Sequence, residues 1–168
     1  QAIGTFTFND RAKTEFDDDF LEDLKAEFKA LERISLSDDE FQYMNSNCKY
    51  IPQNYFEWLL GFRFDASKIN VWLDEDKHLQ IEVTDYMYKV TLYEIPILAT
   101  VSELFHRRNS YDAEAMIKRL EKKEQIARDN GLIFSDFGTR RRFSYDVQRM
   151  VVKHLKNNPC GCTGTSNC

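Results

Sequence analysis

The sequence predicts an α+β domain over residues 1–130, followed over residues 131–168 by the first βα unit of a parallel sheet or barrel. Three observations predict this order. In the first part, alternating apolar and polar segments lie between helix-like stripes, which is typical of antiparallel strands beside helices. The run Leu132–Phe134 is apolar without alternation, which is typical of a buried parallel strand. A loop, an amphipathic helix and a β-prone segment near 162–165 complete a strand–helix–strand order.

The composition is that of a globular protein. Of the 168 residues, 42% are hydrophobic and 30% charged, which provides for a packed core. The formal net charge of −5 argues against a general nucleic-acid partner. No apolar run approaches the roughly 20 residues that cross a bilayer, and no signal peptide opens the chain, so we expect a cytoplasmic protein without a membrane partner. Gln1 in place of Met indicates that the natural N-terminus lies upstream.

The cysteines are concentrated at the end of the chain, where Cys160, Cys162 and Cys168 follow the earlier Cys48. Without secretory signals, we expect reduced thiols. The pair Cys160 and Cys162 near His154 could suggest a metal, but the spacing fits no common zinc pattern. We therefore assign no metal ligand and leave the role of the three C-terminal cysteines open.

The predicted α+β domain opens with a strand over residues 2–8 and a helix whose start is offered by Thr14-x-x-Asp17. A capping box at Ser37 predicts a short helix, and another helix is expected over residues 53–62. Alternation predicts a hairpin of 69–73 with 79–83, and then a strand near 88–93. Several apolar residues of these helices are expected to face the core of the domain. They are Phe16, Phe20, Leu24, Phe28 and Leu31 in the first helix, and Phe56, Leu59 and Leu60 in the third.

Longer helices follow. Pro96 suits the first turn of one helix, where its missing N–H has no partner in any case. Asp112 can cap a second helix and Gly131 can end it. A buried strand over Leu132–Asp136, a loop over 138–143 and a last helix complete the pattern. The residues expected on buried helix faces are Ile97, Val101, Leu104 and Phe105, then Ala113, Met116, Leu120 and Ala127, then Val147, Val151 and Leu155.

The sharpest chemical feature is Ser135-Asp136-Phe137-Gly138-Thr139-Arg140-Arg141-Arg142, where a predicted strand passes into a loop. Ligands of parallel α/β structures bind at this carboxyl end of the strands. Adjacent guanidinium groups offer paired donors to phosphate or carboxylate, and Gly138 lets the backbone approach a ligand. Phe137 offers a flat face to an aromatic ring. The alternative is a solvated turn with Phe137 in the core.

A second feature is Gly164-Thr165-Ser166-Asn167, at the end of the next expected strand. Its hydroxyl and amide groups suit hydrogen bonds to a ligand, although an ordinary polar turn has the same composition. The three histidines form no catalytic spacing, and we expect His106 to pack at the surface.

These residues resemble the signatures of bacterial nicotinate phosphoribosyltransferases. The resemblance rests on Asp136 to Ser144 and on Gly164 to Asn167, with support from Trp58 to Phe64 and from Glu94 to Glu103. It implies an N-terminal α/β domain followed by an irregular α/β barrel like that of type II phosphoribosyltransferases. It also implies transfer of phosphoribosyl from phosphoribosyl diphosphate to nicotinate, coupled to ATP hydrolysis with Mg²⁺, in a homodimer whose sites lie at the subunit interface.

Carried over to this sequence, the resemblance implies that Phe137 and Gly138 border the pyridine ring and that Arg140 contacts the nicotinate carboxylate or the phosphates, with Arg141 as a second. Ser166, after Thr165, would lie near the ring substituent. The family's Asp-x-Asp-x-Tyr-Lys-like opening is absent from this chain, and its phosphorylated histidine is expected beyond Cys168. We therefore expect a truncated enzyme that is inactive by itself.

Two other readings stay open. Nicotinamide phosphoribosyltransferases are similar around Phe137, but they resemble this chain less from Thr139 to Arg142 and carry Asp where this chain has Ser166. An Asp accepts from an amide but repels a carboxylate, so Ser166 and the extra arginines favour the acid. The second reading is a catalytically inert module that serves folding or dimerisation.

Overall fold

The computed structural model describes residues 2–156 and the backbone of 161–163. The chain forms two compact units, Gln1–Val90 and Thr91–Cys168, which are described separately. This division falls inside helix α4 (Met87–Asn109), upstream of the boundary near Asn130 that the change of sequence pattern predicts. The Asn130 boundary therefore stays a prediction.

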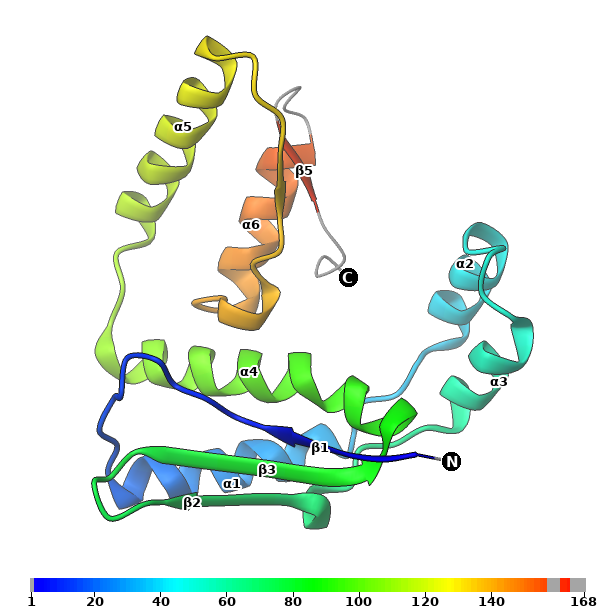
Figure 1. The fold of residues 1–168 in the computed structure, drawn as a ribbon. Coiled ribbons are helices and arrows are strands. Elements are labelled where there is room, and N and C mark those ends of the chain that lie inside the picture. The colour runs from blue at the N-terminus through cyan, green and yellow to red at the C-terminus, as the bar shows by residue number, and fades with distance from the viewer. Residues whose placement is uncertain (1, 157–160, 164–168) are drawn as a thin grey trace. The chain divides into compact units, whose positions relative to one another are not determined.

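The first unit is built on a three-stranded antiparallel sheet of order β1-β3-β2 (Figure 1). Its strands are β1 (Ile3–Thr7), β2 (Ile69–Leu73) and β3 (Leu79–Tyr86). The predicted first strand and hairpin are confirmed. Alternate residues of β3, namely Leu79, Ile81 and Val83, are at most 2% exposed and form the inner face of the sheet.

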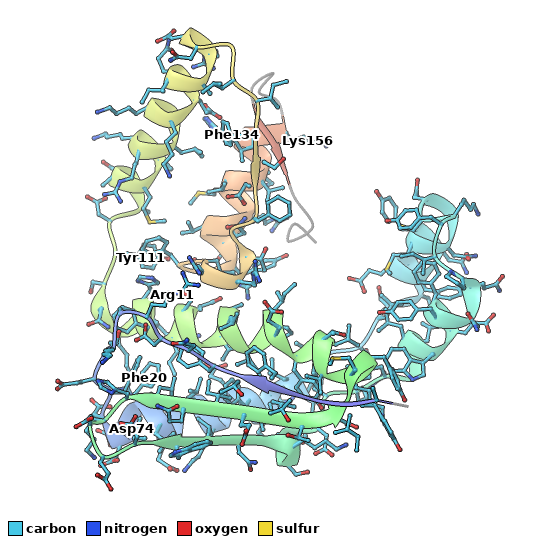
Figure 2. All side chains as sticks on the ribbon, in the orientation of Figure 1. Arg11, Phe20, Asp74, Tyr111, Phe134 and Lys156 are labelled. Carbon is cyan, nitrogen blue, oxygen red and sulfur yellow. The ribbon has the colours of Figure 1, made fainter. Side chains whose placement is uncertain are left out.

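Helix α1 (Asp18–Leu31) supplies the other side of this core. Phe20 (marked in Figure 2), Leu24, Phe28 and Leu31 recur at helical spacing and are buried, as predicted. The helix is capped by Asp17, whose carboxylate accepts from the Phe20 amide at 2.6 Å. Thr14 cannot start the helix, because the backbone of Glu15 is bridged to His78.

Two short helices lie between α1 and the hairpin, α2 (Asp38–Asn47) and α3 (Gln53–Gly61), followed by the 3₁₀ turn η1 (Ala66–Lys68). The predicted capping box is confirmed: Ser37 Oγ accepts from the Glu40 amide, and the Glu40 carboxylate accepts from the Ser37 amide. Phe56 is buried as expected, whereas Leu59 and Leu60 are half-buried.

The strand predicted near 88–93 and the helix start predicted at Pro96 are wrong, because α4 runs through both without interruption. Proline inside a helix removes one hydrogen bond and costs about 3 kcal/mol. The helix continues because Val90, Tyr93, Ile97, Val101 and Leu104 are all buried, at spacings of three and four residues. Burial along this stripe outweighs the local preferences of the segment.

The second unit contains α5 (Ala113–Asp129), β4 (Phe134–Asp136), the 3₁₀ turn η2 (Thr139–Arg141), α6 (Tyr145–Lys156) and β5 (Gly161–Thr163). Asp112 caps α5, and Gly131 follows its end at φ +62°, both as predicted. Strands β4 and β5 run parallel on either side of α6 in the sequence, which confirms the predicted βα unit (Figure 1).

The prediction of a buried strand over Leu132–Asp136 is only partly right. The strand is shorter, and Leu132 and Ile133 are 55% and 79% exposed. Within the described ranges β4 pairs with β5 alone. A parallel strand needs cover on both faces and both edges to be buried, and this part of the chain supplies only some of that cover.

None of the helices in the described part of the chain is long and apolar enough to span a membrane.

Candidate functional site

The arginine-rich loop begins at the carboxyl end of β4, as the sequence predicts. Asp136 ends the strand, and its carboxylate accepts from the Gly138 amide at 3.0 Å and from Gln148 Nε2 on α6 at 2.7 Å. A Cβ on Gly138 would lie 2.8 Å from Gln148 Oε1 and 3.0 Å from Asp136 Oδ2. Glycine at this position therefore lets the strand end and α6 come together around one carboxylate, and its contact with a ligand stays a prediction.

Phe137 lies at the surface of the described chain and is 55% exposed. This exposure contradicts the alternative that placed Phe137 in the core. A large aromatic face next to a strand end is available to stack on a planar ring.

The three arginines of the loop have three different environments. Arg140 Nη1 lies 2.5 Å from Glu94 Oε1, in a pair that is about half exposed. Arg142 Nε lies 3.0 Å from Glu103 Oε2, and both of these side chains are less than one quarter exposed. Arg141 is exposed and forms no ion pair with any described residue. The solvated-turn alternative therefore fails for Arg142, and Arg141 is the guanidinium left available to an external anion.

The end of the loop is held by α4 and by the segment after it. Ser102 Oγ donates to the Arg142 carbonyl at 3.0 Å. The His106 ring stacks on Phe143, with 4.0 Å between ring centroids. Tyr111, marked in Figure 2 between α4 and α5, shares a 3.1 Å hydrogen bond with Ser144 Oγ. Three consecutive loop residues are thus fixed through their backbone, ring and hydroxyl groups.

His106 packs at the edge of the loop, in agreement with the packing role that we expected, and its partner is Phe143. It is half-buried against Phe143, and burial lowers its pKa below the ordinary value because the charged imidazolium loses water. The ring packs as an aromatic side chain.

A cavity of about 410 Å³ lies beside the loop within the second unit, between α5, α6 and the strand end. Gly138 and Arg141 line it, whereas Phe137 and Arg140 are not among its lining residues. Its walls are largely apolar, and they come from α5 and α6: Met116, Leu120, Val147 and Val151. Of the proposed site residues in the loop, Gly138 and Arg141 thus border this cavity.

The two strands of the parallel pair end at one edge, since Asp136 and Thr163 are register partners. The predicted site residues Thr165 and Ser166 lie outside the described residues. The structure therefore brings together Phe137, Gly138, Arg140 and Arg141 in one loop and leaves the second predicted segment untested.

Sequence reasoning missed the acids that accompany the loop. Glu94 and Glu103 are the acidic residues of α4, and they meet Arg140 and Arg142 respectively. Two isolated acids on an otherwise basic and apolar helix were the available signal. Within residues 2–156, no three His, Cys, Asp or Glu side chains lie close enough together to hold a metal ion.

The family model described as the nicotinate phosphoribosyltransferase N-terminal domain matches residues 1–102. The chain belongs to the nicotinate phosphoribosyltransferase family. A second model, described as the nicotinate phosphoribosyltransferase family, matches residues 132–168, which include β4 and the arginine loop.

Individual nicotinate phosphoribosyltransferases agree with this membership. The protein from Yersinia enterocolitica is 32% identical over 89% of this chain, and that from Methanosarcina acetivorans is 30% identical over 99% of it. The crystal structure of nicotinate phosphoribosyltransferase from Porphyromonas gingivalis has a TM-score of 0.87 and 34% identity over 96% of this chain. The chain spans about two fifths of the length of these relatives, namely 39%, 46% and 42% respectively.

Proposed function

We propose that this chain serves in an enzyme that transfers phosphoribosyl from phosphoribosyl diphosphate to the ring nitrogen of nicotinate. The products are nicotinate mononucleotide and diphosphate, in NAD biosynthesis. The observation that carries the proposal is the loop from Asp136 to Arg142 at the carboxyl end of a parallel strand, inside the segment that the second family model matches. In the proposal, β4, α6 and β5 begin the irregular α/β barrel that holds the site.

The loop has the chemistry that this reaction needs. In the transition state the anomeric carbon of the ribose becomes cationic while diphosphate leaves, so catalysis depends on holding the ring in place and on neutralising anions. Phe137 offers the exposed face on which the pyridine ring stacks. Arg140 and Arg141 bind the nicotinate carboxylate or the phosphates, and Thr165 and Ser166 complete the contacts around the ring.

The unpaired arginine of the loop favours an acid over an amide as substrate. Arg140 and Arg142 pair with Glu94 and Glu103, whereas Arg141 forms no ion pair with any described residue. The guanidinium of Arg141 attracts the carboxylate of nicotinate and gives no comparable advantage to the neutral nicotinamide. A basic loop of this kind is a reason to retain nicotinate, and not nicotinamide, as the proposed substrate.

The wider reaction belongs to the same proposal. ATP hydrolysis would be coupled to the transfer through a histidine beyond Cys168, Mg²⁺ would enter with the phosphates of its substrates, and two subunits would complete each site. Magnesium usually binds proteins through few carboxylates together with substrate phosphates, which is consistent with a site that is not made of protein ligands alone.

The experiment is an assay of the full-length protein that contains this chain, with phosphoribosyl diphosphate and either nicotinate or nicotinamide, each with and without ATP. The proposal predicts nicotinate mononucleotide as the product, with little turnover of nicotinamide. Equal or greater turnover of nicotinamide would contradict the proposed substrate. Formation of neither mononucleotide, by a protein that is folded and dimeric, would favour an inert structural role.

A further inference from the structure

We propose that Arg142 and Glu103 form a positioning pair: Arg142 does not touch substrate, but it fixes the loop so that Arg141 is presented to the substrate anion. The inference rests on the proposed function for the identity of that anion. It divides the three adjacent arginines into two classes, which their sequence does not distinguish.

The two ion pairs of the loop differ in burial. Arg142 and Glu103 are 24% and 23% exposed, whereas Arg140 and Glu94 are 47% and 40% exposed. Water competes for and screens an exposed pair, so such a pair is easily exchanged for a ligand. The less exposed pair is screened less, and an incoming anion would have to leave Glu103 uncompensated to recruit Arg142.

Helix α4 holds Arg142 by its backbone as well as by its side chain. Ser102 Oγ binds the Arg142 carbonyl at 3.0 Å, and the neighbouring Glu103 binds the guanidinium of the same residue at 3.0 Å. One turn further along the helix, His106 stacks on Phe143. The backbone and the side chain of Arg142 are thus both fixed, by the consecutive helix residues Ser102 and Glu103. A residue that positions a loop requires such support from a rigid element.

Arg141 is the last residue of the turn η2, and Arg142 follows it directly. The turn η2 is a single 3₁₀ turn in which the Arg141 amide donates to the Gly138 carbonyl at 2.9 Å. Asp136 and Gln148 hold the beginning of this turn, and Arg142 holds its end. The direction of the exposed Arg141 side chain is therefore set by groups on either side of it, while its guanidinium has no ion-pair partner among the described residues.

The test is a charge exchange in the full-length protein, made of Glu103→Arg, Arg142→Glu and the double variant. Each single reversal is expected to lower kcat/KM for nicotinate by about tenfold to a hundredfold, because a binding group is displaced. The double variant restores an ion pair in which the two charges have changed places. It is expected to recover most of the lost kcat/KM. A double variant as poor as Arg142→Glu would overturn the proposal, because it would show that Arg142 itself binds substrate.

The matched control is the same exchange at the exposed pair, with Glu94→Arg and Arg140→Glu. Arg140 is a proposed substrate contact, so the fall in kcat/KM seen in Arg140→Glu is expected to persist in the double variant. Recovery at both pairs would contradict the division into two classes.

A second readout does not depend on turnover. Hydrogen–deuterium exchange of the segment 137–144, without substrate, is expected to rise in Arg142→Glu and to return toward the wild-type rate in the double variant. An unchanged rate in Arg142→Glu would overturn the positioning role even in a protein with no activity on nicotinate, so the failure of this inference and of the proposed function are distinguishable. Where charge reversal prevents folding, Arg142→Gln is expected to raise exchange and Arg140→Gln is not, and equal rates in these two variants would reject the inference.

Discussion

Glu124 on α5 is 2% exposed, and its Oε2 lies 2.8 Å from Nε2 of His154 on α6. Its second carboxylate oxygen has no hydrogen-bond partner in the described chain. A buried carboxylate with a single polar partner links the two helices of the second unit and depends on that partner for its hydrogen bonding.

Removing His154 is expected to destabilise the second unit more than removing Glu124. His154→Ala leaves a buried acceptor unsatisfied, which costs about 1–3 kcal/mol of unfolding free energy. Glu124→Leu removes the buried charge and keeps an apolar side chain of similar size, so it is expected to be nearly neutral. Urea unfolding of the two variants measures the difference, and a larger loss in Glu124→Leu would show that the carboxylate stabilises the fold by itself.

Loss of Arg141 is expected to reduce turnover of nicotinate severely. Arg141 has no ion-pair partner in the part of the chain that is described, so its whole charge is available to the substrate. Arg141→Ala, like Arg140→Ala, is expected to lower kcat/KM by an amount corresponding to about 2–5 kcal/mol if the arginine pairs with a desolvated anion. Steady-state kinetics of the full-length protein measure this effect.

The control for that experiment is Arg149→Ala, which removes an exposed arginine of α6 from outside the loop. It changes the net charge equally, and kcat/KM is expected to stay close to the wild-type value. Similar small effects at both positions would indicate that the loop is a solvated turn.

The stability of the second unit is expected to fall as the pH is lowered from about 7.5 to about 5.5. Burial lowers the pKa of His106 in the folded chain, so the unfolded chain takes up a proton first. The stabilisation is fully present above the unfolded pKa of about 6.5 and is lost as the pH falls toward the lower folded value.

His106→Phe tests this assignment, because phenylalanine keeps an aromatic ring next to Phe143 and cannot be protonated. The urea midpoint of this variant is expected to change less between the two pH values than that of the wild type. The same pH dependence in both proteins would assign the effect to groups other than His106.

Much of the fold could be predicted because the signals are local. The capping box at Ser37, the cap at Asp112 and the stop at Gly131 each act within one helical turn. Helix α4 could not be predicted in the same way, since Tyr88 and Val90 lie in a β-prone window and Pro96 suggests a helix start. The helix is continuous because apolar residues on both sides of Pro96 are buried along one face. Such burial depends on tertiary packing, which a local pattern does not contain.

The position of the arginine loop after a strand could be predicted from the sequence, but the residues that pair with its arginines could not. The end of the strand before Phe137 could be predicted from the apolar run Leu132–Phe134 and from Gly138. The pairing of Glu94 with Arg140 and of Glu103 with Arg142 spans 46 and 39 residues, and no local pattern encodes contacts at such a separation. The stacking of His106 on Phe143 is missing from the sequence prediction for the same reason.

The most direct test of the account is a crystal structure of the full-length protein with nicotinate bound. The account predicts that the pyridine ring stacks on Phe137 and that the carboxylate lies within hydrogen-bond distance of Arg140 or Arg141, while Arg142 stays paired with Glu103. Nicotinate bound away from this loop, or a carboxylate held by Arg142 with Glu103 displaced, would contradict it.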